Sequence, residues 1–120
     1  MLTLYDNLDS GNAYKVRWIL AQRGLKFKRI ETSVDDGSTQ TAEFLALNPN
    51  GKIPTLVLED GTVLTESNAI LLHFADGTSF WPSERLDQTR VLQWMFFEQY
   101  SHEPFHRDLP LLDFHPRRRK

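Results

Sequence analysis

The chain has 120 residues, of which 40% are hydrophobic and 25% are charged, and its formal net charge is −2. This composition supports a folded core and gives no overall argument for a nucleic-acid or membrane partner. The absence of cysteine excludes disulfides, thiolate zinc sites and Cys-x-x-Cys redox chemistry. Because we find neither a signal-peptide pattern nor an apolar run that could span a bilayer, we expect a soluble, cytoplasmic protein.

The first half of the chain predicts strands alternating with helices. Residues 2–5 alternate in polarity as a short strand does, and residues 13–23 carry apolar side chains at helical spacing before Gly24. Residues 25–32 alternate again, and a short helix is predicted at 41–47. A strand, helix, strand succession favours parallel pairing of the two strands.

The following segment predicts a hairpin and a helix. Residues 55–58 are apolar on both faces, which is typical of a central strand, and Glu59-Asp60-Gly61 predicts the turn into a return strand at 62–64. Residues 67–75 are apolar nearly all round, so we expect a largely buried helix with His73 packed in the core. The fold class is therefore α/β, in the order β-α-β-α-β-β-α.

We expect this α/β domain to occupy residues 1–78 and a helical segment to occupy residues 83–120. Ser83 is the predicted N-cap of a long helix in that segment. Four terminal basic residues, 117–120, form a run that we interpret as a solvated tail rather than a nucleic-acid site.

The loop from Asn48 to Pro54 has the pattern of a binding site. Its Asn, Pro and Gly residues form turns, and Pro54 stands where a strand begins. A cis Ile53-Pro54 bond would turn the backbone of Ile53 outward, where it could pair with a peptide-like ligand. Glu66 and Ser67 would face the same cleft from a helix N-terminus.

Three motifs in this order resemble the glutathione S-transferase family over residues 1 to about 102. They are Tyr5-Asp6 with Ser10-Gly11-Asn12 and Lys15-Val16-Arg17, Asn48-Pro49 with Gly51-Lys52-Ile53-Pro54-Thr55-Leu56, and Glu66-Ser67-Asn68-Ala69-Ile70. The resemblance implies a thioredoxin-like N-terminal domain that binds glutathione and an all-helical domain that supplies an electrophile pocket. It also implies a cytoplasmic dimer active in detoxification.

The resemblance assigns the parts of glutathione to separate residues. The backbone of Ile53, before the cis proline, pairs with the cysteinyl part, and Glu66 with Ser67 holds the γ-glutamyl end. Lys52 is placed for the glycyl carboxylate, with Gln40 as a weaker helper. A helix N-terminus favours a carboxylate, which agrees with these roles.

Catalysis in the family requires the thiolate of bound glutathione, because the thiolate is the nucleophile. Ser10, at the start of the first helix, is the best match to the family's serine, and Asn12 is the alternative donor. Tyr5 matches the family's tyrosine less well, because it ends a strand. Taken alone, Ser10 and Ser67 would be read as ordinary helix caps, and only the joint pattern favours a site.

The run from His102 to His106 matches H-E-x-x-H, but we expect no metal site. Pro104 interrupts the helix that would have to turn both histidines toward one metal, and no clear third ligand follows, although His115 is present.

The resemblance covers only about the first helix of the family's second domain, so we expect one or two helices of a truncated all-α domain. Its apolar residues predict an exposed patch and a homodimer or higher oligomer. They are Leu92, Met95, Phe96 and Phe97. We predict a protein that binds glutathione and, if active, transfers its thiolate to a small electrophile. The alternative is a non-catalytic thioredoxin-fold interaction module; a glutaredoxin is excluded by the missing cysteine.

Overall fold

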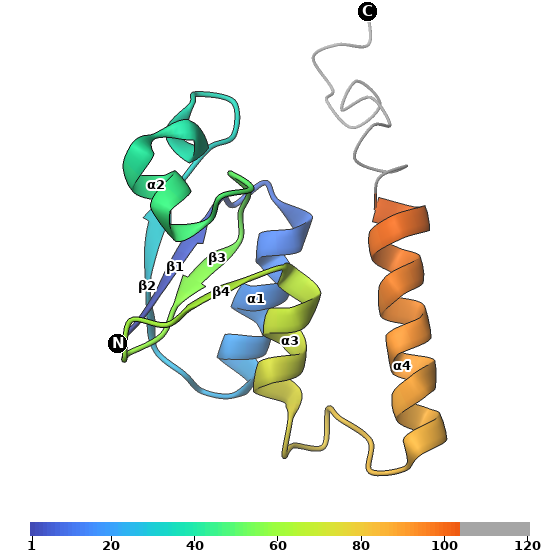
Figure 1. Ribbon diagram of the computed structural model, residues 1–120. Coiled ribbons are helices and arrows are strands. Elements are labelled where there is room, and N and C mark those ends of the chain that lie inside the picture. Colours follow the sequence, from blue (N-terminus) through green and yellow to red (C-terminus); the bar gives the residue numbers. More distant parts are fainter. Residues whose placement is uncertain (104–120) are drawn as a thin grey trace, which may run out of the picture. The chain divides into compact units, whose positions relative to one another are not determined.

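The computed structural model describes residues 1–103, which divide into a compact unit Met1–Trp81 and a second unit that begins at Pro82. The histidine motif beyond Glu103, His115 and the basic run 117–120 lie outside the described residues. The elements (Figure 1) are β1 Leu2–Asp6, α1 Gly11–Gln22, β2 Phe27–Glu31, the 3-10 helix η1 Ser38–Gln40, α2 Ala42–Leu47, β3 Thr55–Val57, β4 Val63–Thr65, α3 Ser67–Ala75, α4 Arg85–Phe97 and the π-helical turn η2 Glu98–His102.

The four strands form one mixed sheet in the order β2-β1-β3-β4. β1 pairs with β2 in parallel, and β3 pairs with both β1 and β4 antiparallel. The predicted parallel pair, the hairpin and the interior position of the third strand are therefore confirmed. With its helices, this sheet is the thioredoxin-like α/β fold that the sequence predicts.

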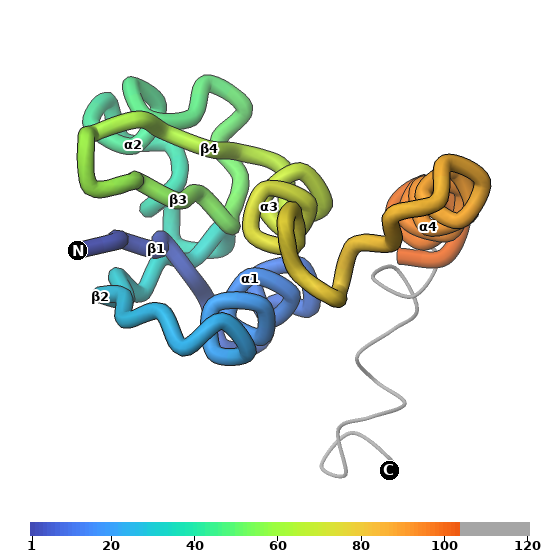
Figure 2. The backbone as a smooth tube through the Cα atoms, turned by 90° about the horizontal axis from the view of Figure 1, so that it is seen from below, coloured from blue at the N-terminus to red at the C-terminus, as the bar shows by residue number. Residues whose placement is uncertain are grey.

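The core lies between the sheet and the helices α1 and α3, which run side by side along one face (Figure 2). Its buried members are aliphatic or aromatic, and each removes apolar surface from water. They are Leu2, Leu4, Val16, Ile19, Leu20, Leu56, Ile70 and Phe74. Tyr5 points to the opposite face of the sheet from Leu4, and its ring meets Phe44 of α2 edge-on at 5.6 Å.

Two local predictions are wrong. His73 is exposed, because α3 buries only the face that carries Ser67, Ile70 and Phe74, and its ring meets the Phe74 ring edge-on at 4.9 Å. Ser83 is not the cap of α4: the N-cap is Glu84, which makes no side-chain capping hydrogen bond.

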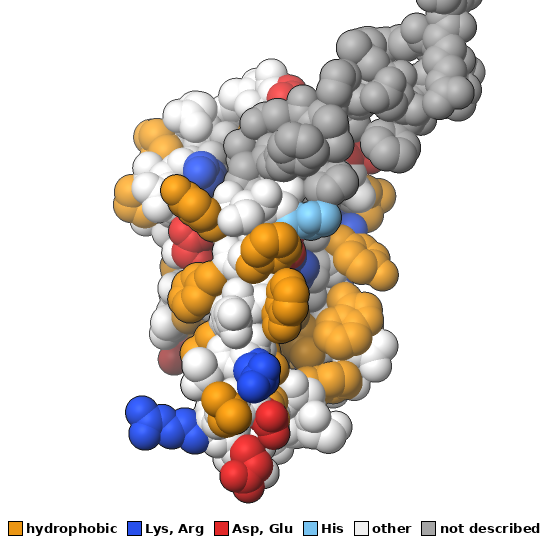
Figure 3. Space-filling view, turned by 90° about the vertical axis from the view of Figure 1, so that its right-hand side faces the viewer, with side chains coloured by type: hydrophobic (Ala, Val, Ile, Leu, Met, Phe, Trp, Pro, Cys, Tyr) orange, Lys and Arg blue, Asp and Glu red, His pale blue; other side chains and the backbone are white. Residues whose placement is uncertain are grey.

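The second unit presents α4, in which no residue is buried. Large exposed apolar side chains of this unit are Leu86, Trp94, Phe96, Phe97 and Tyr100. Figure 3 shows hydrophobic side chains along α4. Within residues 1–103, no helix has the length and apolar character needed to cross a bilayer.

The last residue of β1, Asp6, carries a buried charge. The side chain of Asp6 has no solvent exposure and forms ion pairs with Arg17 of α1 and Arg29 of β2. Arg17 also donates to the backbone oxygen of Asn7 at 3.2 Å. The hydrogen bond to Asp6, and a second one to Glu31 at 2.6 Å, raise the pKa of the Arg29 guanidinium. The three chain segments are thus held at one point.

We predict that Asp6→Asn lowers the free energy of unfolding by about 3 kcal/mol, because it leaves two guanidinium groups without the carboxylate that they share. Urea unfolding measures this change. Asp9→Asn is the matched control, since Asp9 is exposed, and it should change stability by less than about 0.5 kcal/mol. Equal effects of the two substitutions would contradict a stabilising role for the buried charge.

Candidate functional site

The strand register brings three chain segments to one end of the sheet. Tyr5 pairs with Thr55, and Thr55 pairs with Thr65. The residues next to this row leave the sheet together: the loop after β1 leads to Ser10, Pro54 precedes β3, and Glu66 follows β4. The candidate residues from all three motifs therefore meet at the same edge.

The loop before β3 is held by the buried side chain of Asn48. Its Nδ2 donates to the backbone oxygen of Lys52 at 2.9 Å and to Oγ1 of Thr55 at 3.1 Å. Its Oδ1 accepts from the backbone N–H of Asn50 at 3.0 Å, and the Thr55 hydroxyl also donates to the Lys52 oxygen at 2.9 Å. The carbonyl of Lys52 is thus bound inward while its exposed side chain extends outward.

Gly51 brings Gln40 beside this loop. Its φ of +61° is one that glycine adopts readily, and a Cβ there would lie 2.5 Å from Nε2 of Gln40 and 3.0 Å from the backbone oxygen of Thr39. The end of η1 therefore packs against the loop, with the exposed residues Gln40 and Lys52 near one another in the fold.

The peptide bond between Ile53 and Pro54 is cis, as the family resemblance implies. Pro54 is buried and Ile53 is half-buried. Within residues 1–103, the backbone N–H and C=O of Ile53 form no hydrogen bond with other backbone groups. The chain next to the cis bond can therefore pair with an extended ligand.

Glu66 begins α3 in a strained backbone conformation, with φ 68° and ψ 111°. Such a conformation in a non-glycine residue costs on the order of 1–3 kcal/mol and is typical of functional sites. The Glu66 side chain is exposed and does not cap the helix, while Ser67, the first helical residue, is buried. A carboxylate and a helix N-terminus thus stand side by side.

Ser10 is the N-cap of α1, and its Oγ accepts from the backbone N–H of Ala13 at 3.1 Å. The bond uses a lone pair of the hydroxyl and leaves its O–H as a donor. Two residues on, Oδ1 of Asn12 lies 3.4 Å from Oγ of Ser67. The N-terminal turns of α1 and α3 therefore meet, and Ser10, Asn12 and Ser67 come from adjoining turns.

Sequence reasoning assigned no role to Asn48, Lys15 or Asn68. Asn48 appears there only as a turn former and a motif residue, because the sequence does not show that its side chain is buried. Lys15 donates through Nζ to Oδ1 of Asn68 at 3.2 Å and so adds a second bridge between α1 and α3. Sequence alone could not find that bridge, since the two residues are 53 positions apart.

Among residues 1–103, no group of three or more His, Asp or Glu side chains is arranged to hold a metal ion. His102 and Glu103 are the members of the histidine motif that the structure describes.

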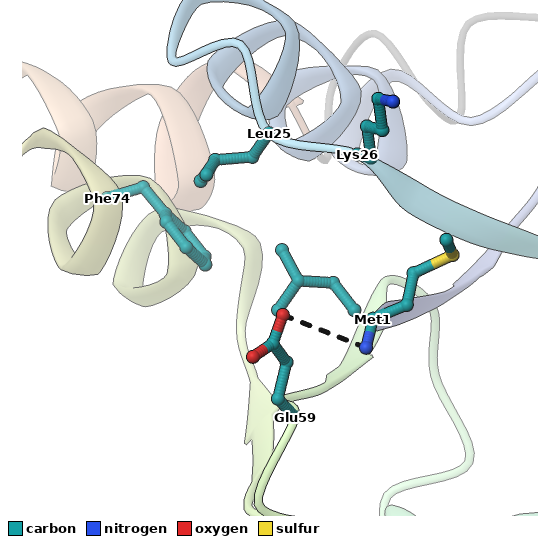
Figure 4. A pocket seen from close by; sticks show the side chains of 6 residues that line it. Met1, Leu25, Lys26, Glu59 and Phe74 are labelled. Atoms are coloured by element: carbon teal, nitrogen blue, oxygen red, sulfur yellow. Dashed lines mark ion pairs between the residues drawn. The ribbon is translucent and has the colours of Figure 1, made fainter.

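A hollow lies at the opposite end of the sheet from the residues of the three motifs, where β1 begins. It has a volume of about 400 Å³ and is lined by Met1, Leu2, Leu25, Lys26, Glu59 and Phe74. Figure 4 shows Leu25 and Phe74 pointing into it, and the amino group of Met1 lies 3.7 Å from Oε1 of Glu59. Its lining contains none of the residues that the three motifs supply.

Comparisons with known proteins identify the fold and the family of the chain. A crystal structure of a glutathione S-transferase from Pseudomonas fluorescens Pf-5 is 55% identical, with a TM-score of 0.84, over 87% of this chain and 52% of that chain. A structure of Ure2p in complex with glutathione is 29% identical, with a TM-score of 0.77, over 86% of this chain and 46% of that one. The transcriptional regulator URE2 of Saccharomyces cerevisiae is 29% identical over 85% of this chain and 31% of its own length.

The chain thus spans about half of these solved structures and about a third of that curated relative. Residues 1–76, well over half of the sequence, match the family described as "Glutathione S-transferase, N-terminal domain". The chain belongs to the glutathione S-transferase family.

Proposed function

We propose that this protein binds glutathione at the end of the sheet where β1, β3 and β4 meet their loops. The observation that carries the proposal is the backbone of Ile53, which forms no hydrogen bond with other described backbone groups and precedes β3 where Thr55 pairs with Thr65, the residue before Glu66 and α3. An extended tripeptide fits this arrangement, because its backbone can pair with Ile53 while its charged ends reach groups on either side. The glutathione complex of Ure2p supports the same ligand.

Each part of glutathione has a partner in this proposal. The γ-glutamyl carboxylate lies at the positive end of the α3 dipole and accepts from the O–H of Ser67, which turns to it from Oδ1 of Asn12, and the γ-glutamyl ammonium group donates to Glu66. The cysteinyl backbone pairs with Ile53. The glycyl carboxylate reaches Lys52, with Gln40 beside the same loop.

The thiol of the bound ligand then lies near the start of α1, where Ser10 donates its O–H to the thiolate. The hydroxyl proton of Ser10 is available for this role, because the hydrogen bond from the backbone N–H of Ala13 uses only a lone pair of the Ser10 oxygen. The α1 N-terminus adds its positive dipole, which also favours an anion. Asn12 remains the alternative donor.

We further propose that the whole protein transfers this thiolate to a small electrophile in the cytoplasm, as part of detoxification. The similarity to a glutathione S-transferase at 55% identity supports the transfer activity. The proposal extends beyond the described residues, because the chain spans about half of that relative.

A second candidate function is that of a non-catalytic interaction module, which the similarity to the transcriptional regulator URE2 favours. Retention on immobilised glutathione, followed by an assay with a generic electrophile, distinguishes the two functions. Turnover favours the transferase, and binding without turnover favours the module.

We predict that the double variant Glu66→Ala with Ser67→Ala loses at least about tenfold in glutathione affinity, because hydrogen bonds to charged groups contribute about 1.5–3 kcal/mol each. Isothermal titration measures the dissociation constant. Glu59→Ala removes an exposed glutamate at the other end of the sheet and should bind like the wild type. Unchanged affinity in the double variant would refute the site.

We predict that Ser10→Ala raises the pKa of the bound glutathione thiol toward its free value of roughly 8.5, with a smaller effect on affinity. The ultraviolet absorbance of the thiolate, followed against pH, measures this pKa. Asn12→Ala is compared in parallel, and the variant with the larger rise identifies the donor. Equal losses of affinity and thiolate in Ser10→Ala would mean that Ser10 acts only as a helix cap.

We also propose that the protein forms a homodimer or higher oligomer through the exposed apolar side chains of α4, since such patches mark association surfaces. Light scattering should give at least a dimer at micromolar concentration. The double variant Trp94→Ser with Phe96→Ser should shift the protein toward monomer, whereas Gln93→Ala, also exposed on α4, should not. A wild-type monomer would contradict the proposal.

A further inference from the structure

Two side-chain bridges join the first turns of α1 and α3. One links Asn12 to Ser67 at 3.4 Å, and the other runs from Nζ of Lys15 to Oδ1 of Asn68 at 3.2 Å. Asn12 and Lys15 are three residues apart and so share one face of α1, while Ser67 and Asn68 are consecutive at the start of α3. The half-buried Lys15 therefore lies against the first turn of α3, which forms part of the proposed site.

The bridge places a positive group at the start of α3, where the chain also carries a negative one. The exposed carboxylate of Glu66 lies immediately before the helix, and the ammonium group of Lys15 is tied to its second residue, Asn68. Between them is Ser67. A negative and a positive group thus flank one helix turn, and this pattern complements a ligand end that carries both an ammonium and a carboxylate group.

We propose that Lys15, held by Asn68, is a positioning residue that selects ligands with a free γ-glutamyl amino-acid end. The inference rests on the proposed function. Lys15 acts through Asn68 on the first turn of α3 and adds its charge to the helix dipole there, so the ligand carboxylate is favoured on that side and the ligand ammonium on the Glu66 side.

A purely structural role predicts something different. A staple between α1 and α3 would affect stability, and through it the binding of every ligand alike. A charge-positioning role affects only ligands with the γ-glutamyl end, keeps its effect when arginine replaces lysine, and weakens with salt because the interaction is electrostatic.

The test is isothermal titration of Lys15→Met and Lys15→Arg with glutathione and with cysteinylglycine, which lacks the γ-glutamyl group. We expect Lys15→Met to weaken glutathione binding about tenfold and to flatten its salt dependence, with most affinity kept in Lys15→Arg. Cysteinylglycine should bind both variants as it binds the wild type. Lys26→Met, at the other end of the sheet, removes the same charge and controls for net charge.

Three results would overturn the inference. In the first, Lys15→Met binds glutathione like the wild type. In the second, Lys15→Met weakens the binding of glutathione and of cysteinylglycine equally, and thermal unfolding shows a matching loss of stability. That result indicates that Lys15 only holds α1 and α3 together. If the wild type itself does not bind glutathione, the proposed function fails together with this inference.

Discussion

A carboxylate without solvent exposure stands where β1 ends, and the arrangement of the first unit depends on how its charge is balanced. Asp6 is paired with Arg17 on the crossover helix and with Arg29 on the parallel strand. A charge at that depth is tolerated only with partners, so strand, neighbour and helix are fixed relative to one another. The chain leaves β1 from this fixed point, and four residues later Ser10 caps α1. The position of the proposed thiolate donor therefore depends on an ion-pair cluster that is not itself part of the proposed site.

Two backbone positions in the proposed site, Gly51 and Glu66, have a positive φ, and a different type of residue occupies each of them. At Gly51 the absence of a Cβ allows Gln40 to approach, so glycine serves both conformation and packing. At Glu66 a side chain is kept although φ is 68° and glycine would relieve the strain. A role of the Glu66 carboxylate in binding the ligand explains why the strain is kept, since a glycine at this position would have no carboxylate. Gly51 lies in the loop before β3 and Glu66 lies at the start of α3, so the two positions lie on the two sides of the proposed peptide site.

Local patterns in the sequence predict most of the fold. Alternation, helical spacing and the Asp-Gly turn each depend on near neighbours, and the pairing of Thr55 with Thr65 follows from that turn. The cis bond before Pro54 does not follow from the residues alone, because the trans form is the commoner one before proline, and it was expected only from the family resemblance. The residues of the three motifs lie together at one end of the sheet, which makes that end the candidate site.

Long-range polar contacts were not predictable in the same way. The burial of Asp6 depends on two arginines from different elements, and the bridge from Lys15 to Asn68 spans 53 positions. His73 was placed in the core because its neighbours are apolar, but only one face of α3 meets the sheet. Periodicity identifies a helix, whereas the width of its buried face is set by the elements packed against it.

All residues of the proposed glutathione site lie within the unit Met1–Trp81, and their positions are fixed by contacts inside that unit. The proposed glutathione site therefore includes no residue of α4. Transfer to an electrophile has a further requirement. The electrophile needs a wall of protein side chains beside the glutathione site, which excludes water and orients the electrophile. The two candidate functions thus share one ligand site and differ only in that wall, so a protein of this family can keep the binding while the transfer is lost.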